Sequence, residues 1–332
     1  MKKVNVAILG ATGAVGREML KVLEERNFPV GELRLLASKR SVGLKIPFAG
    51  KNYAVSEATH DSFEEMDIVL GATSNALAKE MAPYIKAAGA VFVDNSSAFR
   101  MSDDVPLIVP EINPKDAEKH NGIIANPNCS TIITLVAVNA FNSISKIKTM
   151  TASTYQAVSG AGAGGPIELL GEAEAVMKGE KYENTVFPYQ IAYNLIPMIG
   201  SPSAEGYTTE EMKMQNEGRK IMHLPKLLVS CTCVRVPVVR SHSISVTVET
   251  EDEISVEKAR EIISKAPGCK LVDDYANGKY PMPLDTSDQD TVFVGRIRPD
   301  FTKKNSINIF CCGDQVRKGA ATNAIQIAEL LI

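Results

Sequence analysis

The chain has 332 residues, of which 45% are hydrophobic and 23% are charged. This composition is typical of a globular protein, and the length is sufficient for two domains. The formal net charge is −3 and no long basic run is present, which argues against a nucleic-acid-binding protein. No apolar stretch approaches the ~18 residues that a membrane helix needs. We therefore expect a cytoplasmic protein that binds small molecules, with no nucleic-acid or membrane partner.

The first third of the chain alternates between short apolar segments and amphipathic segments. We predict strands at about 3–9, 32–37, 67–72 and 90–94, and helices at about 14–26 and 75–88. Such alternation is typical of an α/β fold with a doubly wound parallel sheet, which is the Rossmann-type nucleotide-binding architecture. We place this domain at residues 1–128.

From about residue 145 the pattern changes to longer strand-like runs. We predict strands at 147–155, 226–236 and 243–249, separated by helices near 166–178, 209–221 and 255–265. This mixture predicts a second, α+β domain with a mixed sheet, at residues 129–314. The last segment, 315–332, contains an amphipathic helix that we expect to complete the first domain.

A glycine motif, Gly10-Ala-Thr-Gly-Ala-Val-Gly16, joins the first predicted strand to the first helix. Glycines there allow a tight turn and a close approach of the backbone, and the helix N-terminus that follows can bind a pyrophosphate. The alternative is a turn that only packs a helix on a strand.

The segment after the second predicted strand bears on the choice of nucleotide. An acidic residue at this place would bind the ribose hydroxyl of NAD, but the sequence is Ala37-Ser-Lys-Arg-Ser41. Two cations and two hydroxyls suit a 2′-phosphate, so the segment favours NADP. The alternative is a solvated basic turn, since lysine and arginine are common on surfaces.

Cys129 lies where the Pro-containing loop Asn126-Pro-Asn gives way to an apolar helix. Backbone N–H groups and the helix dipole at that position favour the thiolate over the thiol, so Cys129 is a candidate nucleophile. The other cysteines form no Cys-x-x-Cys pair and lie in strand-like contexts, which gives no support to a disulfide framework or a zinc site. They are Cys231, Cys233, Cys269, Cys311 and Cys312.

His242 is the best candidate for a general acid or base, because it begins a predicted strand shortly after two arginines. Strand alternation places it on the same face as Ile244, Val246 and Val248, so a partly buried core histidine is an equal alternative. Whether Arg235 shares this face is left open, because Pro237 interrupts the strand register between the two residues.

Three further polar features have both functional and structural interpretations. Arg100 follows a strand end and either binds a phosphate or forms a surface ion pair. The segment Thr154–Gly165 ends in a glycine loop that either contacts a ligand or only connects two elements. Glu210 and Lys213 lie three residues apart on a helix, a spacing that usually means a solvated ion pair.

Together these segments resemble the aspartate-β-semialdehyde dehydrogenase family. The resemblance extends over essentially the whole chain, and its motifs occur in the family's order. The segments that carry it are 10–16, 96–100, 126–131, 156–160, 210–213, 235–242 and 313–321.

The resemblance implies an NADP-dependent reductive dephosphorylation of 4-phospho-L-aspartate to L-aspartate 4-semialdehyde through a cysteine thioester. This reaction belongs to the biosynthesis of lysine, threonine and methionine. A second domain like that of glyceraldehyde-3-phosphate dehydrogenase, and a homodimer or homotetramer built on it, are also implied.

The resemblance assigns roles to residues that the patterns alone leave open. Cys129 is implied as nucleophile, His242 as acid and base, and Gln156 as the residue that orients the intermediate. For the substrate, Arg235 would bind the α-carboxylate, Glu210 the α-amino group, and Arg100 and Lys213 phosphate; Asn128 also belongs to this set. The implied cofactor residues are Gly10, Thr12, Gly13, Ala14, Val15, Gly16, Ser38, Arg40, Ser41, Ser159, Gly160 and Gln315, and no metal is implied.

Two other functions fit parts of the sequence. N-acetyl-glutamyl-phosphate reductase would share the architecture and the thiolate chemistry, but its N-acylated substrate gives no reason for a carboxylate at Glu210. A non-catalytic NADP-binding regulator would need Cys129 only as a helix-start residue. One spectrophotometric assay of aldehyde-dependent NADPH formation in phosphate buffer would separate these two functions from aspartate-semialdehyde dehydrogenase.

Overall fold

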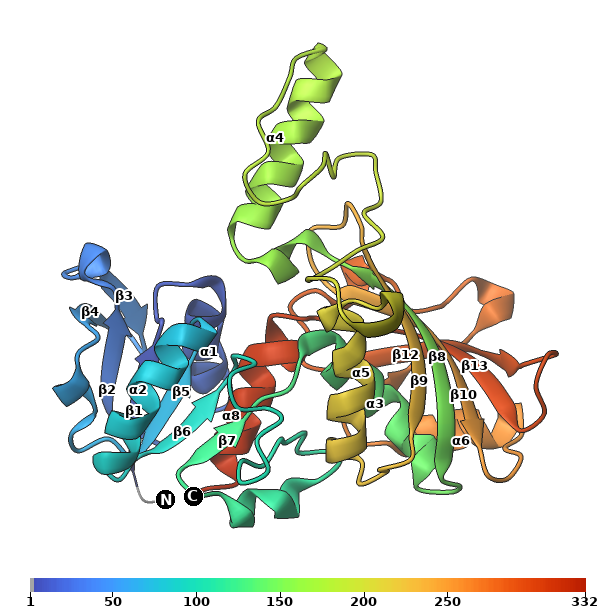
Figure 1. The fold of residues 1–332 in the computed structure, drawn as a ribbon, viewed down its shortest axis with the longest axis horizontal. Helices are drawn as coiled ribbons and strands as arrows, with labels where there is room; N and C mark the ends of the chain where they lie inside the picture. Colours follow the sequence, from blue (N-terminus) through green and yellow to red (C-terminus); the bar gives the residue numbers. More distant parts are fainter. Residues whose placement is uncertain (1–2) are drawn as a thin grey trace. The chain divides into compact units, whose positions relative to one another are not determined.

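The computed structural model describes residues 3–332, so the first two residues of the predicted first domain lie outside it. The chain forms two compact units (Figure 1). The first contains the chain up to Asn128 together with Ala320–Ile332, and the second is Cys129–Gly319. Among the described residues, no helix is long and apolar enough to cross a membrane.

The first unit is built on a seven-stranded sheet with the strand order β3-β4-β2-β1-β5-β6-β7. All neighbouring strands are parallel except β3 and β4, so the predicted doubly wound parallel sheet is confirmed. The strands are β1 (Val4–Leu9), β2 (Val30–Ala37), β3 (Lys45–Phe48), β4 (Lys51–Glu57), β5 (Ile68–Gly71), β6 (Val91–Asp94) and β7 (Ile123–Ala125).

The antiparallel hairpin of β3 and β4 at the sheet edge was not predicted from the sequence. Its two-residue turn is Ala49-Gly50, and both residues have positive φ angles, of 47° and 75°. Such turns normally carry asparagine or aspartate at the first position, and alanine gives no such signal.

Three helices pack in the first unit. The helix α1 (Ala14–Glu25) buries Met19, Leu20 and Leu23 at helical spacing and contacts α8 (Thr322–Glu329). The helix α2 (Asn75–Ala87) packs against β6. The Ser74 side chain caps α2 by accepting a hydrogen bond from the N–H of Leu77.

The helix α8 begins later than residue 315, where the predicted C-terminal segment starts. Asp314 Oδ1 accepts hydrogen bonds from the N–H groups of Val316 and Arg317, and a π-helical turn, Arg317–Ala321, follows before α8. The carboxylate therefore holds residues 314–317 in a turn, which delays the regular helix.

The second unit contains a six-stranded mixed sheet with the order β11-β12-β13-β10-β8-β9, as predicted for its class. Two neighbouring pairs are parallel, β8 with β9 and β11 with β12, and the others are antiparallel. The strands are β8 (Ile147–Gln156), β9 (Leu228–Arg235), β10 (His242–Thr250), β11 (Cys269–Leu271), β12 (Val292–Pro299) and β13 (Ser306–Gly313).

The helices that pack against this sheet include α3 (Cys129–Asn142), α5 (Thr209–Ile221) and α6 (Val256–Lys265). Alternate residues of β8, β10 and β13 are buried. A cavity of about 450 Å³ is lined by Tyr155, which is exposed, and by Ser245 and Phe310, which are partly exposed. The sheet therefore has one covered face and one face with accessible aromatic side chains.

The helix α4 (Gly164–Lys178) stands away from the sheet of its unit, and the chain that follows it runs back alongside it (Figure 1). Gly179 ends α4 in a left-handed conformation. The remaining short helices are α7 (Pro283–Thr286) and 3-10 turns at Lys39–Ser41, His60–Phe63, Pro114–Lys119, Val158–Ala161, Ala204–Gly206 and Tyr275–Asn277.

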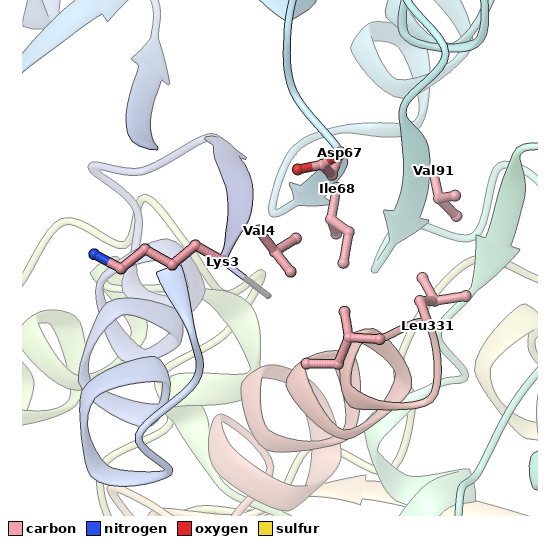
Figure 2. Close-up of a pocket in the computed structure, with 7 residues that line it drawn as sticks. Lys3, Val4, Asp67, Ile68, Val91 and Leu331 are labelled. Carbon is pink, nitrogen blue, oxygen red and sulfur yellow. The ribbon is translucent and has the colours of Figure 1, made fainter. Parts of the chain in front are cut away.

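A cavity of about 280 Å³ lies at the amino ends of β1, β5 and β6 in the first unit, and Figure 2 shows the residues that line it. The apolar side chains of Val4, Ile68 and Leu331 surround it. Ligands of doubly wound sheets bind at the carboxyl ends of the strands, and Gly10 follows that end of β1. This cavity therefore lies at the edge of the sheet opposite to the predicted nucleotide loop.

Candidate active site

Cys129 is the first residue of α3, as predicted. The helix follows Pro127, and nearly all of its residues are buried, so packing fixes the position of its first turn. Cys129 itself is partly exposed. The thiol is therefore accessible and lies at the positive end of a helix that is held rigidly in the core.

His242 begins β10 and lies beside Cys129, with 3.4 Å between His242 Nε2 and Cys129 Sγ. The other ring nitrogen, Nδ1, accepts a hydrogen bond from the N–H of Ala157 at 3.0 Å. Because Nδ1 acts as an acceptor, the proton of the neutral ring is on Nε2 and faces the sulfur.

Burial lowers the pKa of His242 to about 3, and the positive charge of Arg235 adds to this effect. The ring is therefore neutral at pH 7, and its Nε2–H can donate to a thiolate or to an oxyanion on a carbon bound to the sulfur. The alternative of an ordinary core histidine does not account for the contact with Cys129.

Gln156 ends β8 and contacts an ion pair formed by two other predicted residues. Its Nε2 donates to Glu210 Oε1 at 3.3 Å, and Lys213 Nζ lies 2.8 Å from Glu210 Oε2. Glu210 is buried and Lys213 is partly buried, so this ion pair is not the solvated surface pair that the spacing usually indicates.

Arg235 ends β9 and is 7% exposed. Its Nη1 donates to the carbonyl of Ala157 at 2.7 Å, and no carboxylate of residues 3–332 forms an ion pair with it. Burial lowers the pKa of Arg235, while the charges of Cys129 and Glu210 oppose that shift. A buried cation without a carboxylate partner is costly, which is typical of a site for an anionic ligand.

Gly160 shows that Arg235 and His242 lie close together, which the sequence left open. A Cβ atom at Gly160 would lie 2.9 Å from Arg235 Nη1 and 3.0 Å from His242 Cε1. Any side chain at this position would displace one of the two residues. The glycine loop therefore borders the cluster around Cys129, and it is more than a connection between elements.

The predicted nucleotide loop is well formed in the first unit. Gly10 has a φ of +93°, and a Cβ atom there would lie 2.2 Å from the carbonyl oxygen of Ala72. Within residues 3–332, the N-terminus of α1 has no side-chain cap and no acidic residue in its first turn. These features fit a diphosphate, which would be held by backbone N–H groups and the helix dipole.

The basic segment after β2 is a 3-10 turn, Lys39–Ser41, preceded by Ser38. Ser38 and Arg40 are exposed, and Ser41 is partly exposed. Arg40 is therefore accessible to a ligand at the carboxyl end of the sheet.

In the second unit Ser159 and Gln315 are joined by a side-chain hydrogen bond, and Gln315 Oε1 also accepts the N–H of Ser241 at 2.8 Å.

Arg100 lies in the first unit, in the loop after β6. Its Nε donates to the carbonyl of Asn126 at 2.9 Å and its Nη2 to the carbonyl of Asn95 at 2.8 Å. Burial raises the pKa of Asp94, although Ser96 and Arg100 oppose that shift. Arg100 therefore also fixes the loop that carries it, a task that the sequence does not reveal. Asn128 is the residue immediately before α3.

Three residues around the cluster were not predicted from the sequence. The N–H of Ala157 fixes the His242 tautomer, and Glu211 accepts the N–H groups of Cys233 and Thr208 at 3.0 and 2.7 Å, which ties α5 to β9. Gly319 lies against the nucleophile, because a Cβ atom there would be 2.9 Å from that of Cys129. The only signal was that Ala157, Glu211 and Gly319 lie in motifs that carry the resemblance.

Two family models match the chain: the NAD binding domain of semialdehyde dehydrogenases over residues 5–120, and their dimerisation domain over residues 139–318. Together with the cysteine and histidine pair, these matches define the class of the chain as a semialdehyde dehydrogenase. More narrowly, the chain belongs to the aspartate-semialdehyde dehydrogenase family.

Curated relatives and a solved structure define this membership. Aspartate-semialdehyde dehydrogenases of Aquifex aeolicus and Synechocystis sp. are 50% and 47% identical to the chain, covering 98% and 99% of it and 97% of each relative. The crystal structure of aspartate semialdehyde dehydrogenase II from Vibrio cholerae, complexed with ASA, is 43% identical with a TM-score of 0.96. That match covers 100% of this chain and 98% of the other.

Proposed function

We propose that the chain is an aspartate-semialdehyde dehydrogenase that converts 4-phospho-L-aspartate to L-aspartate 4-semialdehyde in the biosynthesis of lysine, threonine and methionine. The observation that carries this proposal is the contact between Cys129 Sγ and His242 Nε2 beside a buried Arg235. The names of the relatives and the ligand of the Vibrio cholerae structure support the choice of substrate.

In the biosynthetic direction, the Cys129 thiolate attacks the acyl carbon of the substrate. A C–S bond forms, the C–O bond to the phosphoryl group breaks, and inorganic phosphate leaves. N–H groups at the start of α3 and the Nε2–H of His242 stabilise the oxyanion at this carbon. After reduction, the C–S bond breaks, the aldehyde leaves, and the electron pair returns to the sulfur.

The roles of the remaining residues follow from their chemistry. Arg235 binds the substrate α-carboxylate, Glu210 its α-amino group, and Gln156 orients the carbon bound to sulfur. Lys213 and Arg100 bind the phosphate. Glu210, a carboxylate, suits a free amino group better than the amide of an N-acetylated substrate, which favours aspartate semialdehyde over the N-acetyl-glutamyl analogue.

The cofactor is a nicotinamide nucleotide, and we take it to be NADP. When bound, it supplies the hydride for reduction. The loop Gly10–Gly16 would hold its diphosphate, with Thr12, Ala14 and Val15 beside it, and Ser38, Arg40 and Ser41 would hold the 2′-phosphate. In the second unit, Ser159, Gly160 and Gln315 would be the residues that contact the cofactor. On this proposal the first unit is the NADP-binding domain, and the second is the catalytic and dimerisation domain.

The assembly that we expect is a homodimer or homotetramer. The second unit matches a dimerisation domain, and one face of its sheet carries the accessible aromatic side chains of Tyr155 and Phe310; the exposed Tyr280 of a loop lines the same cavity. Location in the cytoplasm remains a prediction from the sequence.

A spectrophotometric assay tests the proposed function. With L-aspartate semialdehyde, NADP and phosphate, NADPH should form, and the rate should fall to background without phosphate or arsenate. The N-acetylated glutamate semialdehyde should give no measurable rate. Failure to reduce NADP under any of these conditions would indicate a non-catalytic nucleotide-binding protein instead.

The preference for NADP should depend on Arg40. Replacing Arg40 with aspartate puts a negative charge where the 2′-phosphate would bind, so kcat/KM for NADP should fall about tenfold to a hundredfold. The same change should leave kcat/KM for NAD within about threefold, because NAD carries a ribose hydroxyl at that position. An unchanged NADP/NAD ratio in Arg40→Asp would show that other residues select the cofactor.

A further inference from the structure

The segment that follows α4 lies alongside that helix and forms a small apolar cluster with it. This return segment, defined as residues 184–196, contributes Phe187, Ile191 and Ile196, which are all buried. They pack with Leu169 of α4 and with Val158. The return segment is therefore an ordered part of the second unit, although it contains no helix or strand.

Two buried carboxylates of α4 hold the return segment. Glu168 accepts hydrogen bonds from the N–H groups of Thr185, Val186 and Phe187 at 2.6, 2.7 and 2.8 Å. One turn further along, Glu172 Oε2 accepts those of Ile191 and Ala192, each at 2.7 Å. Charge-assisted bonds of this kind are the stronger class of hydrogen bond, so five backbone N–H groups are fixed by two side chains.

The ionisation of Glu168 agrees with this role. Burial raises its pKa, but the hydrogen bonds from Thr185, Phe187 and Val186 outweigh burial and lower the pKa below its ordinary value. The carboxylate is therefore charged at neutral pH. Backbone N–H groups of the return segment stabilise this charge. Moving the segment would therefore leave a buried carboxylate without its hydrogen bonds.

The return segment contacts Arg235 at both its backbone and its side chain. Ile196 and Arg235 exchange two backbone hydrogen bonds, of 3.1 and 2.9 Å, as in an antiparallel bridge. The Cζ atom of Arg235 lies over the ring of Phe187, 5.8 Å from its centroid, which is within the range of cation–π attraction.

A guanidinium binds a carboxylate through paired N–H groups at its edge, so its orientation decides whether both bonds form. In Arg235 one N–H is already directed to the carbonyl of Ala157. An aromatic ring on the face of the group fixes its plane without using a further donor. Phe187 is 8% exposed, and its own N–H is bonded to Glu168, so the ring is held in place.

We propose that Phe187, held by Glu168, is a positioning residue that orients the Arg235 guanidinium to bind the α-carboxylate of the substrate. This inference rests on the proposed function of Arg235. Phe187 acts through Arg235 and need not touch the substrate itself.

The test compares Phe187→Leu, which keeps apolar volume without a ring, with Phe187→Tyr, which keeps the ring. Phe187→Leu should raise KM for L-aspartate semialdehyde about threefold to thirtyfold, the range expected for a lost cation–π contact. Its kcat, KM for phosphate and KM for NADP should change less than about twofold. Phe187→Tyr should have a KM for the semialdehyde close to that of the wild type. Equal increases in all three KM values would show that Phe187 has only a structural role, and would overturn the proposal.

A double-mutant cycle with Arg235→Lys tests the positioning role of Phe187 separately from the proposed role of Arg235 in binding the carboxylate. Lysine keeps a charge but lacks the planar group, so Phe187→Leu should add little to the KM increase of Arg235→Lys. If Arg235→Lys raises KM for the semialdehyde and Phe187→Leu does not, the positioning role is wrong and the role of Arg235 stands. If Arg235→Lys leaves that KM unchanged, Arg235 does not bind the carboxylate, and both proposals fail.

The same helix provides a matched control for Glu168. Glu168→Gln should raise the KM for the semialdehyde in the same direction as Phe187→Leu, because an amide cannot accept all the N–H groups of the return segment. Glu174→Gln should leave every KM unchanged, because Glu174 is exposed and forms only a surface ion pair with Lys178. Thermal unfolding of each variant identifies any that fails to fold. A normal KM in a folded Glu168→Gln would remove Glu168 from the proposal.

Discussion

Replacing Cys129 with alanine should abolish turnover while leaving NADP binding nearly unchanged. The loss in kcat should exceed about 10⁴-fold, as when a covalent nucleophile is removed from other enzymes. Cys129 is a small side chain at the start of α3, so its removal should not disturb the helix. Steady-state kinetics and a fluorescence titration with NADPH measure the two quantities.

Alkylation of the native protein provides an independent readout. Cys129 is partly exposed at a helix start, whereas burial raises the pKa of Cys311 well above its ordinary value and that of Cys312 to about 12. Iodoacetamide should therefore label Cys129 first. Cys269, which is also partly exposed, is the matched control, and Cys269→Ala should retain full activity. Full activity of a protein labelled only at Cys129 would contradict the thioester mechanism.

The sequence predicted the parts of the fold that depend on local patterns. Apolar periodicity located β1, β8, β10, α1 and α5 to within a few residues. Cys129 was identified because a proline-containing loop before an apolar run is a local signal for a helix start. The edge hairpin of β3 and β4 was missed because its turn, Ala49-Gly50, lacks the usual residues.

Contacts between distant segments could not be predicted in this way. The N–H of Ala157 reaches His242 across 85 positions of sequence and decides which nitrogen of the ring carries the proton. Likewise, Phe187 lies beside Arg235 in a return segment that is held by two carboxylates of α4 and by the backbone bridge between Ile196 and Arg235. In both pairs, the residues next to each partner in the sequence carry no pattern that would predict the contact. The role of each residue in the reaction remains a proposal from chemistry.

The ion pair of Lys213 and Glu210 shows how the structure changes the expectation for a single motif. The i,i+3 spacing on a helix is usually a surface pair that contributes little. Here Glu210 is buried, also accepts from Gln156, and affects the pKa of both Arg235 and His242 through its charge, so the lysine is paired with a carboxylate of that cluster. A cation held in that way is available for a second anion.

Replacing Lys213 with alanine should therefore raise KM for phosphate in the oxidative direction by about tenfold to a hundredfold, the effect of losing one charge-assisted contact. KM for NADP should change less than about threefold. Arg100→Ala should act in the same direction, but it also removes hydrogen bonds to the carbonyls of Asn126 and Asn95, so its kcat should fall as well.

The matched control is Lys258→Ala, because Lys258 forms an i,i+3 ion pair with Glu261 on α6 in which both residues are exposed. This variant should have a normal KM for phosphate and for NADP. Arsenate should replace phosphate in the wild type, and its KM should rise in parallel in Lys213→Ala, since the contact is with an oxyanion and not with phosphorus. If Lys213→Ala and Arg100→Ala both keep a normal phosphate KM, or if the wild type oxidises the semialdehyde equally fast without an oxyanion, the phosphorylating mechanism is wrong.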